Sequence, residues 1–205
     1  MFKEWKKLAG KPLRIIDILI SIVVIGLTVF LIIYWKHIPE QVPLHWNFAG
    51  EIDDYADAGS YIMLVIMMYF FYAWHQLTKL SPTFGWKENF FGKELAGKVP
   101  EEIEKEAFNA MMLMLWICDL ILQIVLAYIV VCGVFVANLG KWFLSVTFIL
   151  LTADFVWFGI KLVRIKNTVN PITTILINMS IILSGFPASF FHSLNIAYSF
   201  CNYKS

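Results

Sequence analysis

The stretch IIDILISIVVIGLTVFLIIYW, residues 15–35, decides the fold class of this protein. It contains one charged residue, Asp17, and its apolar residues form an unbroken run rather than a stripe on one helix face. Roughly 20 such residues in a helix are enough to cross the hydrocarbon core of a bilayer. The stretch therefore predicts a membrane-spanning helix, with Asp17 close enough to one surface to pair with Arg14 or to reach the interface.

The whole chain has the composition of a membrane protein. Of its 205 residues, 60% are hydrophobic and 15% are charged, and the mean hydropathy is +0.71. Soluble domains are about half apolar and a quarter charged. We therefore expect an all-α polytopic membrane protein that forms a single membrane domain over residues 1–205. About five spans are expected, at residues 15–35, 61–80, 108–137, 142–163 and 172–200, the last kinked or ended early by Gly185 and Pro187.

Two longer connections, residues 36–60 and 81–107, separate the first three spans. Thirteen of the sixteen Lys and Arg residues flank the span ends that lie on the same side as the N-terminus. Because positive charge is enriched in inside loops, we expect the N-terminus and loop 81–107 inside, and the C-terminus and loop 36–60 outside. Pro100, followed by Glu101 and Glu102, also predicts a helix that begins there and continues into the third span.

Charge pattern and cysteine content exclude two other classes of protein. The basic residues are spread among acidic ones and form no basic patch, so no nucleic-acid partner is expected. Cys118, Cys132 and Cys201 are odd in number and contain no CxxC pair, which argues against a disulfide framework or a zinc knuckle. We expect these cysteines to behave as small hydrophobic residues.

The outside loop contains an unusually polar stretch, VPLHWNFAGEIDDY, residues 42–55. The alternation in its first half predicts a short strand. The two faces of that strand would carry Leu44, Trp46 and Phe48 on one side and His45 and Asn47 on the other. A turn follows at Gly50, where a positive φ costs glycine little, and the segment EIDDY would return beside the strand. In such a hairpin, His45 and Asn47 would face Glu51 or Asp53.

Several residues of this loop occur in a distinctive order. They are Pro39, Pro43, His45, Asn47, Gly50, Asp53 and Tyr55. This order resembles the N-terminal domain of the SdpI family, and the resemblance covers about residues 15–74. SdpI-type proteins are bacterial multi-span membrane proteins, and the founding type protects the producing cell from its own toxic peptide and relays the toxin's presence to a repressor. The resemblance implies a non-enzymatic protein of the cytoplasmic membrane of a Gram-positive bacterium, with a role in toxin resistance or signalling.

The polar residues of the loop admit three interpretations. They could hold the hairpin in shape through local hydrogen bonds. They could present an acidic surface to a cationic peptide toxin or to a partner membrane protein, because opposite potentials steer encounter. They could bind a divalent metal, with His45, Glu51 and Asp53 as candidate ligands, although the spacing matches neither an EF-hand nor an HExxH helix, and no other cofactor is expected. The candidate residues for recognition or shaping are His45, Asn47, Gly50, Glu51, Asp53 and Tyr55.

Ionisable residues inside the spans form a second candidate site. Asp119 and Asp154 lie at comparable depths in the third and fourth spans, Gln123 follows Asp119 by one helical turn, and His75 lies near the inside end of the second span. A cluster of these four would bind a proton or a cation, because two neighbouring carboxylates favour sharing a proton. The alternatives are that the same groups only join helices through hydrogen bonds, or that Asp119 and Asp154 stay protonated.

Two functions of different classes follow from these patterns. The first is sensing of, or immunity to, a membrane-active peptide by a non-enzymatic SdpI-type protein that recognises the peptide through the outside loop. The second is a transporter component or a proton- or cation-coupled carrier that uses Asp119 and Asp154. An enzyme of the metal-dependent membrane hydrolase type would need ligands that the sequence does not bring together.

Overall fold

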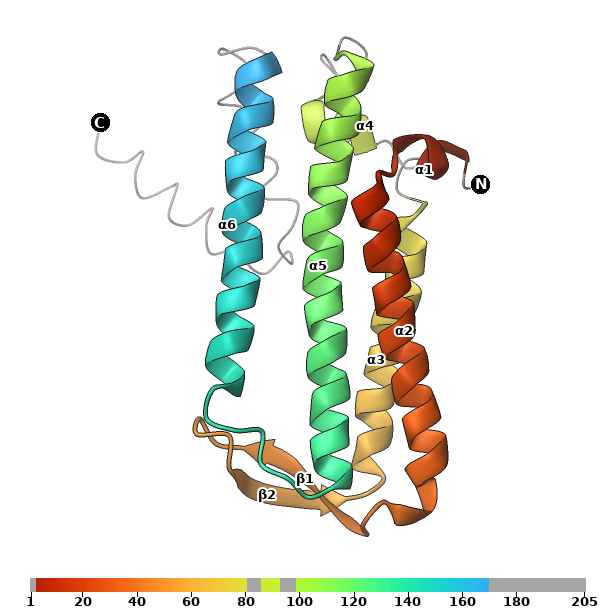
Figure 1. Cartoon of the computed structure of the whole chain (residues 1–205), viewed down its shortest axis with the longest axis vertical. Helices are drawn as coiled ribbons and strands as arrows, with labels where there is room; N and C mark the ends of the chain where they lie inside the picture. The colour runs from red at the N-terminus through yellow and green to blue at the C-terminus, as the bar shows by residue number, and fades with distance from the viewer. Residues whose placement is uncertain (1–2, 81–85, 93–98, 170–205) are drawn as a thin grey trace, which may run out of the picture.

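The computed structural model describes residues 3–80, 86–92 and 99–169 of the chain. The elements, in chain order, are α1 (Lys3–Leu8), α2 (Lys11–Tyr34), the short 3₁₀ helix η1 (Trp35–His37), β1 (Gln41–Trp46), β2 (Ile52–Asp57), α3 (Ser60–Thr78), α4 (Trp86–Phe91), α5 (Glu101–Val134) and α6 (Phe143–Val169). In Figure 1 the long helices α2, α3, α5 and α6 stand upright, with α1 and α4 at one end and β1 and β2 at the other. We call these the α1 end and the hairpin end.

The four long helices, α2, α3, α5 and α6, are each long and apolar enough to cross a membrane. Their outer faces carry large apolar side chains that no other described part of the chain covers, for example Ile32 at 73% exposure and Phe148 at 71%. Such surfaces are stable in lipid and not in water. The protein is therefore an all-α polytopic membrane protein, as the composition predicts. The fifth predicted span, residues 172–200 with Gly185 and Pro187, lies outside the described residues.

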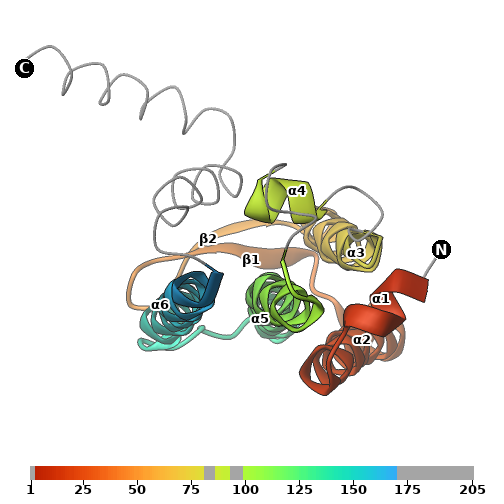
Figure 2. The same cartoon turned by 90° about the horizontal axis from the view of Figure 1, so that it is seen from above.

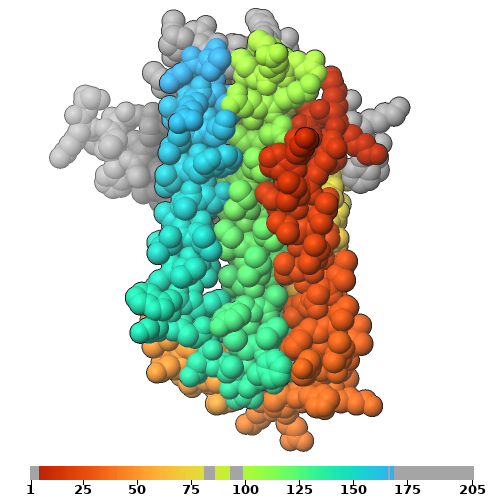
Figure 3. All heavy atoms as spheres, in the orientation of Figure 1, coloured from red at the N-terminus to blue at the C-terminus, as the bar shows by residue number. Residues whose placement is uncertain are grey.

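Helix α5 is the centre of the bundle. Viewed along the helices in Figure 2, α5 lies between α6 and α2, and it contacts α2, α3 and α6. It begins at Glu101, directly after Pro100, as the proline and the following glutamates predict. The last seven residues of the expected connection 81–107 form the start of this helix, in agreement with the predicted helix that continues into the third span. The face formed by α6, α5 and α2 is visible in the space-filling view of Figure 3.

Two buried clusters hold the helices together, one at each end. At the α1 end, aromatic rings of α1, α4 and α5 interlock, with Trp5 and Trp116 centroids 4.8 Å apart and Trp86 and Phe108 centroids 5.1 Å apart. Offset and edge-to-face ring pairs of this kind add to the free energy gained from burial alone. At the hairpin end, Val42 of β1 is buried among apolar side chains of α2, α3 and α5.

The predicted hairpin is present and lies across the ends of the helices (Figure 1). Strands β1 and β2 pair antiparallel from Gln41 opposite Asp57 to Trp46 opposite Ile52, with irregularities on either side of His45. These bulges break the alternation of side chains. The expected common face of Leu44, Trp46 and Phe48 is therefore wrong: Trp46 is half-buried and turns toward the α5–α6 connection, whereas Phe48 is 93% exposed.

Candidate functional site

The turn of the hairpin is shaped by its own polar side chains. Asn47 accepts hydrogen bonds at Oδ1 from the backbone N–H groups of Ala49 (2.9 Å) and Glu51 (3.0 Å), and its Nδ2 donates to Glu51 Oε2 at 3.2 Å. Beside the turn, His45 Nδ1 lies 2.5 Å from Asp53 Oδ1. Asn and Asp side chains that bond to backbone a few residues away typically fix such turns. The structure thus brings together His45 with Asp53 and Asn47 with Glu51.

The hairpin is also fixed to residues 137–140, which are part of the connection between α5 and α6. Trp46 Nε1 donates to the carbonyl of Ala137 at 3.2 Å, and the backbone N–H of Ile52 donates to Asn138 Oδ1 at 3.0 Å. The backbone N–H of Leu139 donates to the carbonyl of Gly50 at 2.8 Å. These contacts join segments about ninety residues apart, so no local pattern in the sequence predicts them.

Gly50 has two reasons to be glycine. Its φ of +74° lies in the left-handed region, as the turn position predicts. A Cβ atom at this position would also lie 2.5 Å from the carbonyl oxygen of Gly140, far inside van der Waals contact. The close approach of two backbones, and not the turn alone, therefore requires glycine here.

A third attachment lies under the first strand. The hydroxyl of Tyr61, at the start of α3, donates to the carbonyl of Pro43 at 2.9 Å, and the tyrosine ring is buried. The ring occupies the space above Gly133 in α5, where an added Cβ would lie 1.2 Å from the tyrosine oxygen. Pro43 and Val42 are buried as a result, so the beginning of β1 is held by the bundle while the turn projects from it.

The exposed face of the hairpin combines negative charge with apolar side chains. Its exposed acidic residues are Glu40, Glu51, Asp53, Asp54 and Asp57. Within residues 36–60 the basic counterpart is Lys36 alone, a count made from the sequence. Phe48 at the turn is exposed almost completely, and Leu44 and Tyr55 are about half exposed. Tyr55 is therefore on the surface, next to the acidic residues.

The described residues contain no group of three or more His, Cys, Asp and Glu side chains placed to hold a metal ion. Of the three candidate ligands in the hairpin, His45 and Asp53 pair with each other, and Glu51 accepts the hydrogen bond from Asn47. This arrangement supports shaping of the turn by the three side chains. The metal-ligand interpretation of the loop receives no geometric support from it.

The second candidate site lies between the spans, toward the α1 end. The side chain of His75 in α3 is 0% exposed, and its two ring nitrogens face carboxylates from two other helices. Nε2 lies 3.1 Å from Asp17 Oδ1 in α2, and Nδ1 lies 3.2 Å from Asp119 Oδ2 in α5. Lys79 Nζ, one turn after His75, lies 2.7 Å from the same oxygen of Asp17. Four ionisable groups from three helices therefore meet in one place.

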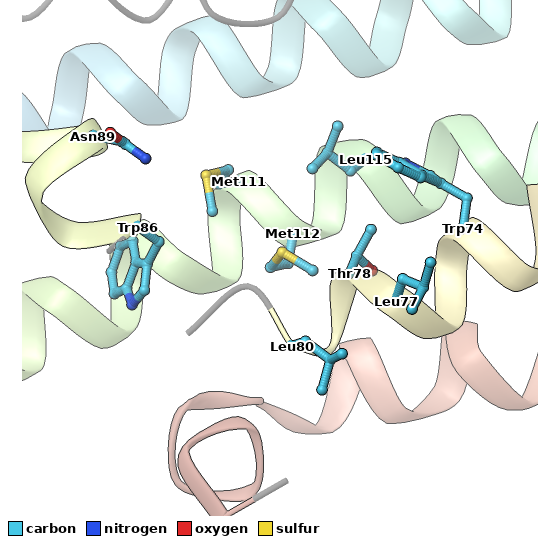
Figure 4. A pocket seen from close by; sticks show the side chains of 9 residues that line it. All are labelled: Trp74, Leu77, Thr78, Leu80, Trp86, Asn89, Met111, Met112 and Leu115. Carbon is cyan, nitrogen blue, oxygen red and sulfur yellow. The ribbon is translucent and has the colours of Figure 1, made fainter. Parts of the chain in front are cut away.

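Trp116 of α5 covers this cluster. Its ring centroid lies 4.2 Å from that of His75. Lys79 Nζ lies over the Trp116 ring, 5.8 Å from its centroid, in a cation–π contact. The indole N–H donates to the hydroxyl of Thr78 at 2.9 Å, so the ring is fixed in position. Thr78 in turn lines an apolar cavity of about 460 Å³ between α3, α4 and α5 (Figure 4).

The remaining two members of the predicted cluster take other contacts. Gln123 is buried, but its Nε2 donates to the backbone carbonyl of Met68 at 3.2 Å, nearer the hairpin end. Asp154 is buried against α5 and accepts a hydrogen bond from Cys118 Sγ at 3.1 Å. The structure therefore joins His75 with Asp119 and assigns Gln123 and Asp154 to separate helix contacts.

Asp17 and Lys79 are the residues of this cluster that sequence reasoning missed. Asp17 was expected beside Arg14 or at the interface, yet it lies against His75 and Lys79. The signal was present, since Asp17 is the one charged residue in the first apolar run and ionisable groups inside spans usually have a partner. Its partners could not be named, because they come from a helix about sixty residues later.

One comparison with known proteins gives a match. Residues 22–77 match the family described as Domain of unknown function (DUF1648). No curated protein and no solved structure matches this chain. The matched segment runs through the second half of α2, the whole hairpin and α3 almost to its end, so it includes His45, Asn47, Asp53 and His75. The part of the chain that carries the hairpin is therefore similar to this domain of unknown function.

Proposed function

We propose that this protein is a non-enzymatic membrane protein of SdpI type that senses, or gives immunity to, a cationic membrane-active peptide. The hairpin is its recognition surface, on the outside of the cytoplasmic membrane of a Gram-positive bacterium. The observation that carries the proposal is that the hairpin is fixed on the α5–α6 connection while its acidic side chains remain exposed. A fixed surface loses little conformational entropy when it binds a partner.

The chemistry of the exposed face suits a cationic amphipathic peptide. Carboxylates attract positive side chains and steer their approach. Phe48, Leu44 and Tyr55 offer apolar area beside that charge. A peptide that carries both cationic and apolar residues would contact both parts of this surface at once. A purely polar ligand would leave the exposed Phe48 without a role.

The domain match adds support of a coarser kind. Residues 22–77 match a domain of unknown function, and they overlap the segment, about residues 15–74, that resembles the SdpI family. The peptide itself is proposed from the surface chemistry and from this resemblance. Immunity and signalling to a partner membrane protein are alternative consequences of the same binding step.

The test is survival of a sensitive Gram-positive host that expresses the protein, challenged with a panel of cationic membrane-active peptides. The informative variant is Glu40→Gln with Asp57→Asn, because these exposed carboxylates lie outside the turn and its hydrogen bonds. We expect wild type to protect against at least one peptide and this variant to lose most of that protection. Phe48→Ala should reduce protection without changing the charge.

The matched control is Asp119→Asn with Asp154→Asn, which removes two carboxylates from the spans and leaves the hairpin intact. Membrane levels of every variant are measured by quantitative blotting. Protection that is lost in the hairpin variants and kept in the span variant supports recognition by the hairpin. Equal loss in both, at equal membrane levels, contradicts it.

Transport is the second candidate function, and the observation that favours it is the cluster of Asp17, His75, Lys79 and Asp119 between the spans. Ionisable groups at such positions are typical of proton- and ion-coupled carriers. The test is flux driven by a pH gradient in proteoliposomes. Transport predicts loss of flux in Asp119→Asn, whereas peptide recognition predicts no such flux in wild type.

A further inference from the structure

We propose that His75 and Asp119 bind one proton between them, with Asp17 and Lys79 as fixed neighbours, and that this proton holds α5 to α3. The inference concerns a site inside the bundle. It does not depend on whether the hairpin binds a peptide or whether the protein transports an ion.

The first step compares the hydrogen-bond donors of the His75 ring with the acceptors around it. A neutral imidazole has one N–H and one lone pair, so it can donate to a single acceptor. In this structure both ring nitrogens face carboxylate oxygens, at 3.1 Å on the Asp17 side and 3.2 Å on the Asp119 side. With a neutral ring and two ionised carboxylates, one ring nitrogen without a proton would lie close to a carboxylate oxygen, and the two atoms both carry negative partial charge. One additional proton removes that repulsion.

The second step is the balance of charge. The titratable and charged groups around the imidazole are Asp17 from α2, Tyr72 and Lys79 from its own helix, and Asp119 from α5. Lys79 balances Asp17, with which it is in direct contact. Asp119 then needs a positive partner, because an unpaired charge at a buried position is costly. A protonated His75 supplies it and leaves the cluster neutral.

The third step locates the proton. His75 Nδ1 and Asp119 Oδ2 are buried atoms with no aligned hydrogen-bond partner among the described residues, although they lie within ion-pair distance of each other. On the opposite side, Nε2 has a hydrogen-bonded partner in Asp17, which Lys79 also holds. Imidazole is ordinarily a stronger base than a carboxylate, so we place the proton on Nδ1, at ion-pair distance from Asp119. The Asp119 side chain is 14% exposed, whereas the imidazole is completely buried.

The bound proton affects how strongly α3 and α5 attract each other. With the proton in place, α3 and α5 attract each other at His75 and Asp119. When the proton leaves, an unprotonated ring nitrogen lies beside a carboxylate oxygen, and the interaction between the two helices weakens. Trp116, which packs on the imidazole and is bonded to Thr78, would report the change because it lies on the same helix as Asp119.

The experiment is ¹⁵N solid-state NMR on full-length protein labelled at histidine and reconstituted in lipid bilayers near neutral pH. The chain has four histidines, and the signal of His75 is assigned by its disappearance in His75→Gln. In wild type we expect both ring nitrogens of His75 to be protonated. In Asp119→Asn we expect this imidazolium signal to be lost and replaced by that of a neutral ring.

The matched control is Asp154→Asn, which removes a buried carboxylate on the neighbouring helix that contacts Cys118 and not His75. Its His75 signal should equal that of wild type. A neutral His75 in wild type, or an imidazolium that persists in Asp119→Asn, would overturn the proposal. If Asp119→Asn does not reach the membrane, the wild-type spectrum alone still decides whether His75 carries the second proton.

Discussion

The hairpin and the buried cluster use the same kinds of side chain in opposite ways. In the hairpin, His45 meets Asp53 eight residues away, at the surface, and the pair shapes a turn. In the bundle, His75 meets Asp17 and Asp119, each more than forty residues away, and the imidazole is completely buried. Water screens and replaces the first pair, but nothing replaces the second. The comparison shows that burial, and not residue type, decides how much a His–Asp contact is worth.

The sharpest way to break this comparison is to remove the buried imidazole. His75→Ala leaves two carboxylates without their shared partner and opens a space against Trp116, so we expect a loss of about 3–5 kcal/mol in unfolding free energy. The measurement is steric trapping or thermal denaturation in bicelles. The control is His37→Ala, which removes an exposed histidine at the hairpin end. A loss below about 1 kcal/mol at His75 would show that burial adds little here.

The attachment between hairpin and bundle can be broken at Gly133. In Gly133→Ala the new methyl group would overlap Tyr61, which must then leave its hydrogen bond to Pro43. We expect a loss of about 2–3 kcal/mol from overpacking and the lost bond. Gly159→Ala is the matched control, because a Cβ at Gly159 in α6 meets nothing within 4 Å. Equal melting temperatures for the two variants would contradict the contact between Tyr61 and Gly133.

The shape of the turn can be tested at Asn47. In Asn47→Ala two backbone N–H groups and Glu51 lose their partner, so we expect a local loss of about 1–2 kcal/mol. The readout is hydrogen exchange of the amides of residues 48–52, which should become faster. Asn138→Ala sharpens the result by detaching the turn from the α5–α6 connection. Unchanged exchange in Asn47→Ala would mean that the connection alone holds the turn.

The smallest effect is expected at the exposed ion pair of the hairpin. Asp53→Asn removes the charge beside His45 but keeps the size of the side chain, and exposed pairs contribute about 0–1 kcal/mol. We expect a change of melting temperature within about 2 °C. The same substitution at the buried site, Asp119→Asn, should have a clearly larger effect. If the two substitutions are equal, the contrast between the regions fails.

The sequence by itself determined the membrane class, the positions of four spans and the hairpin. These features follow from local rules: the length of apolar runs, the alternation of residues 42–48, and the preference for glycine at a turn with positive φ. The pairing of His45 with Asp53 was predictable for the same reason, because a two-stranded hairpin brings near neighbours in sequence face to face.

The tertiary structure alone decided which polar groups meet inside the bundle and what holds the hairpin. Depth along a helix can be counted from the sequence, and it put Asp119 and Asp154 at comparable depths, with His75 near the inside end of its span. The rotation of each helix about its axis cannot be counted in the same way when every face is apolar, because no polar stripe marks the inner side. For that reason the sequence grouped Asp154 and Gln123 with His75, whereas the packing of α2 and α3 on α5 brought Asp17 and Lys79 there instead.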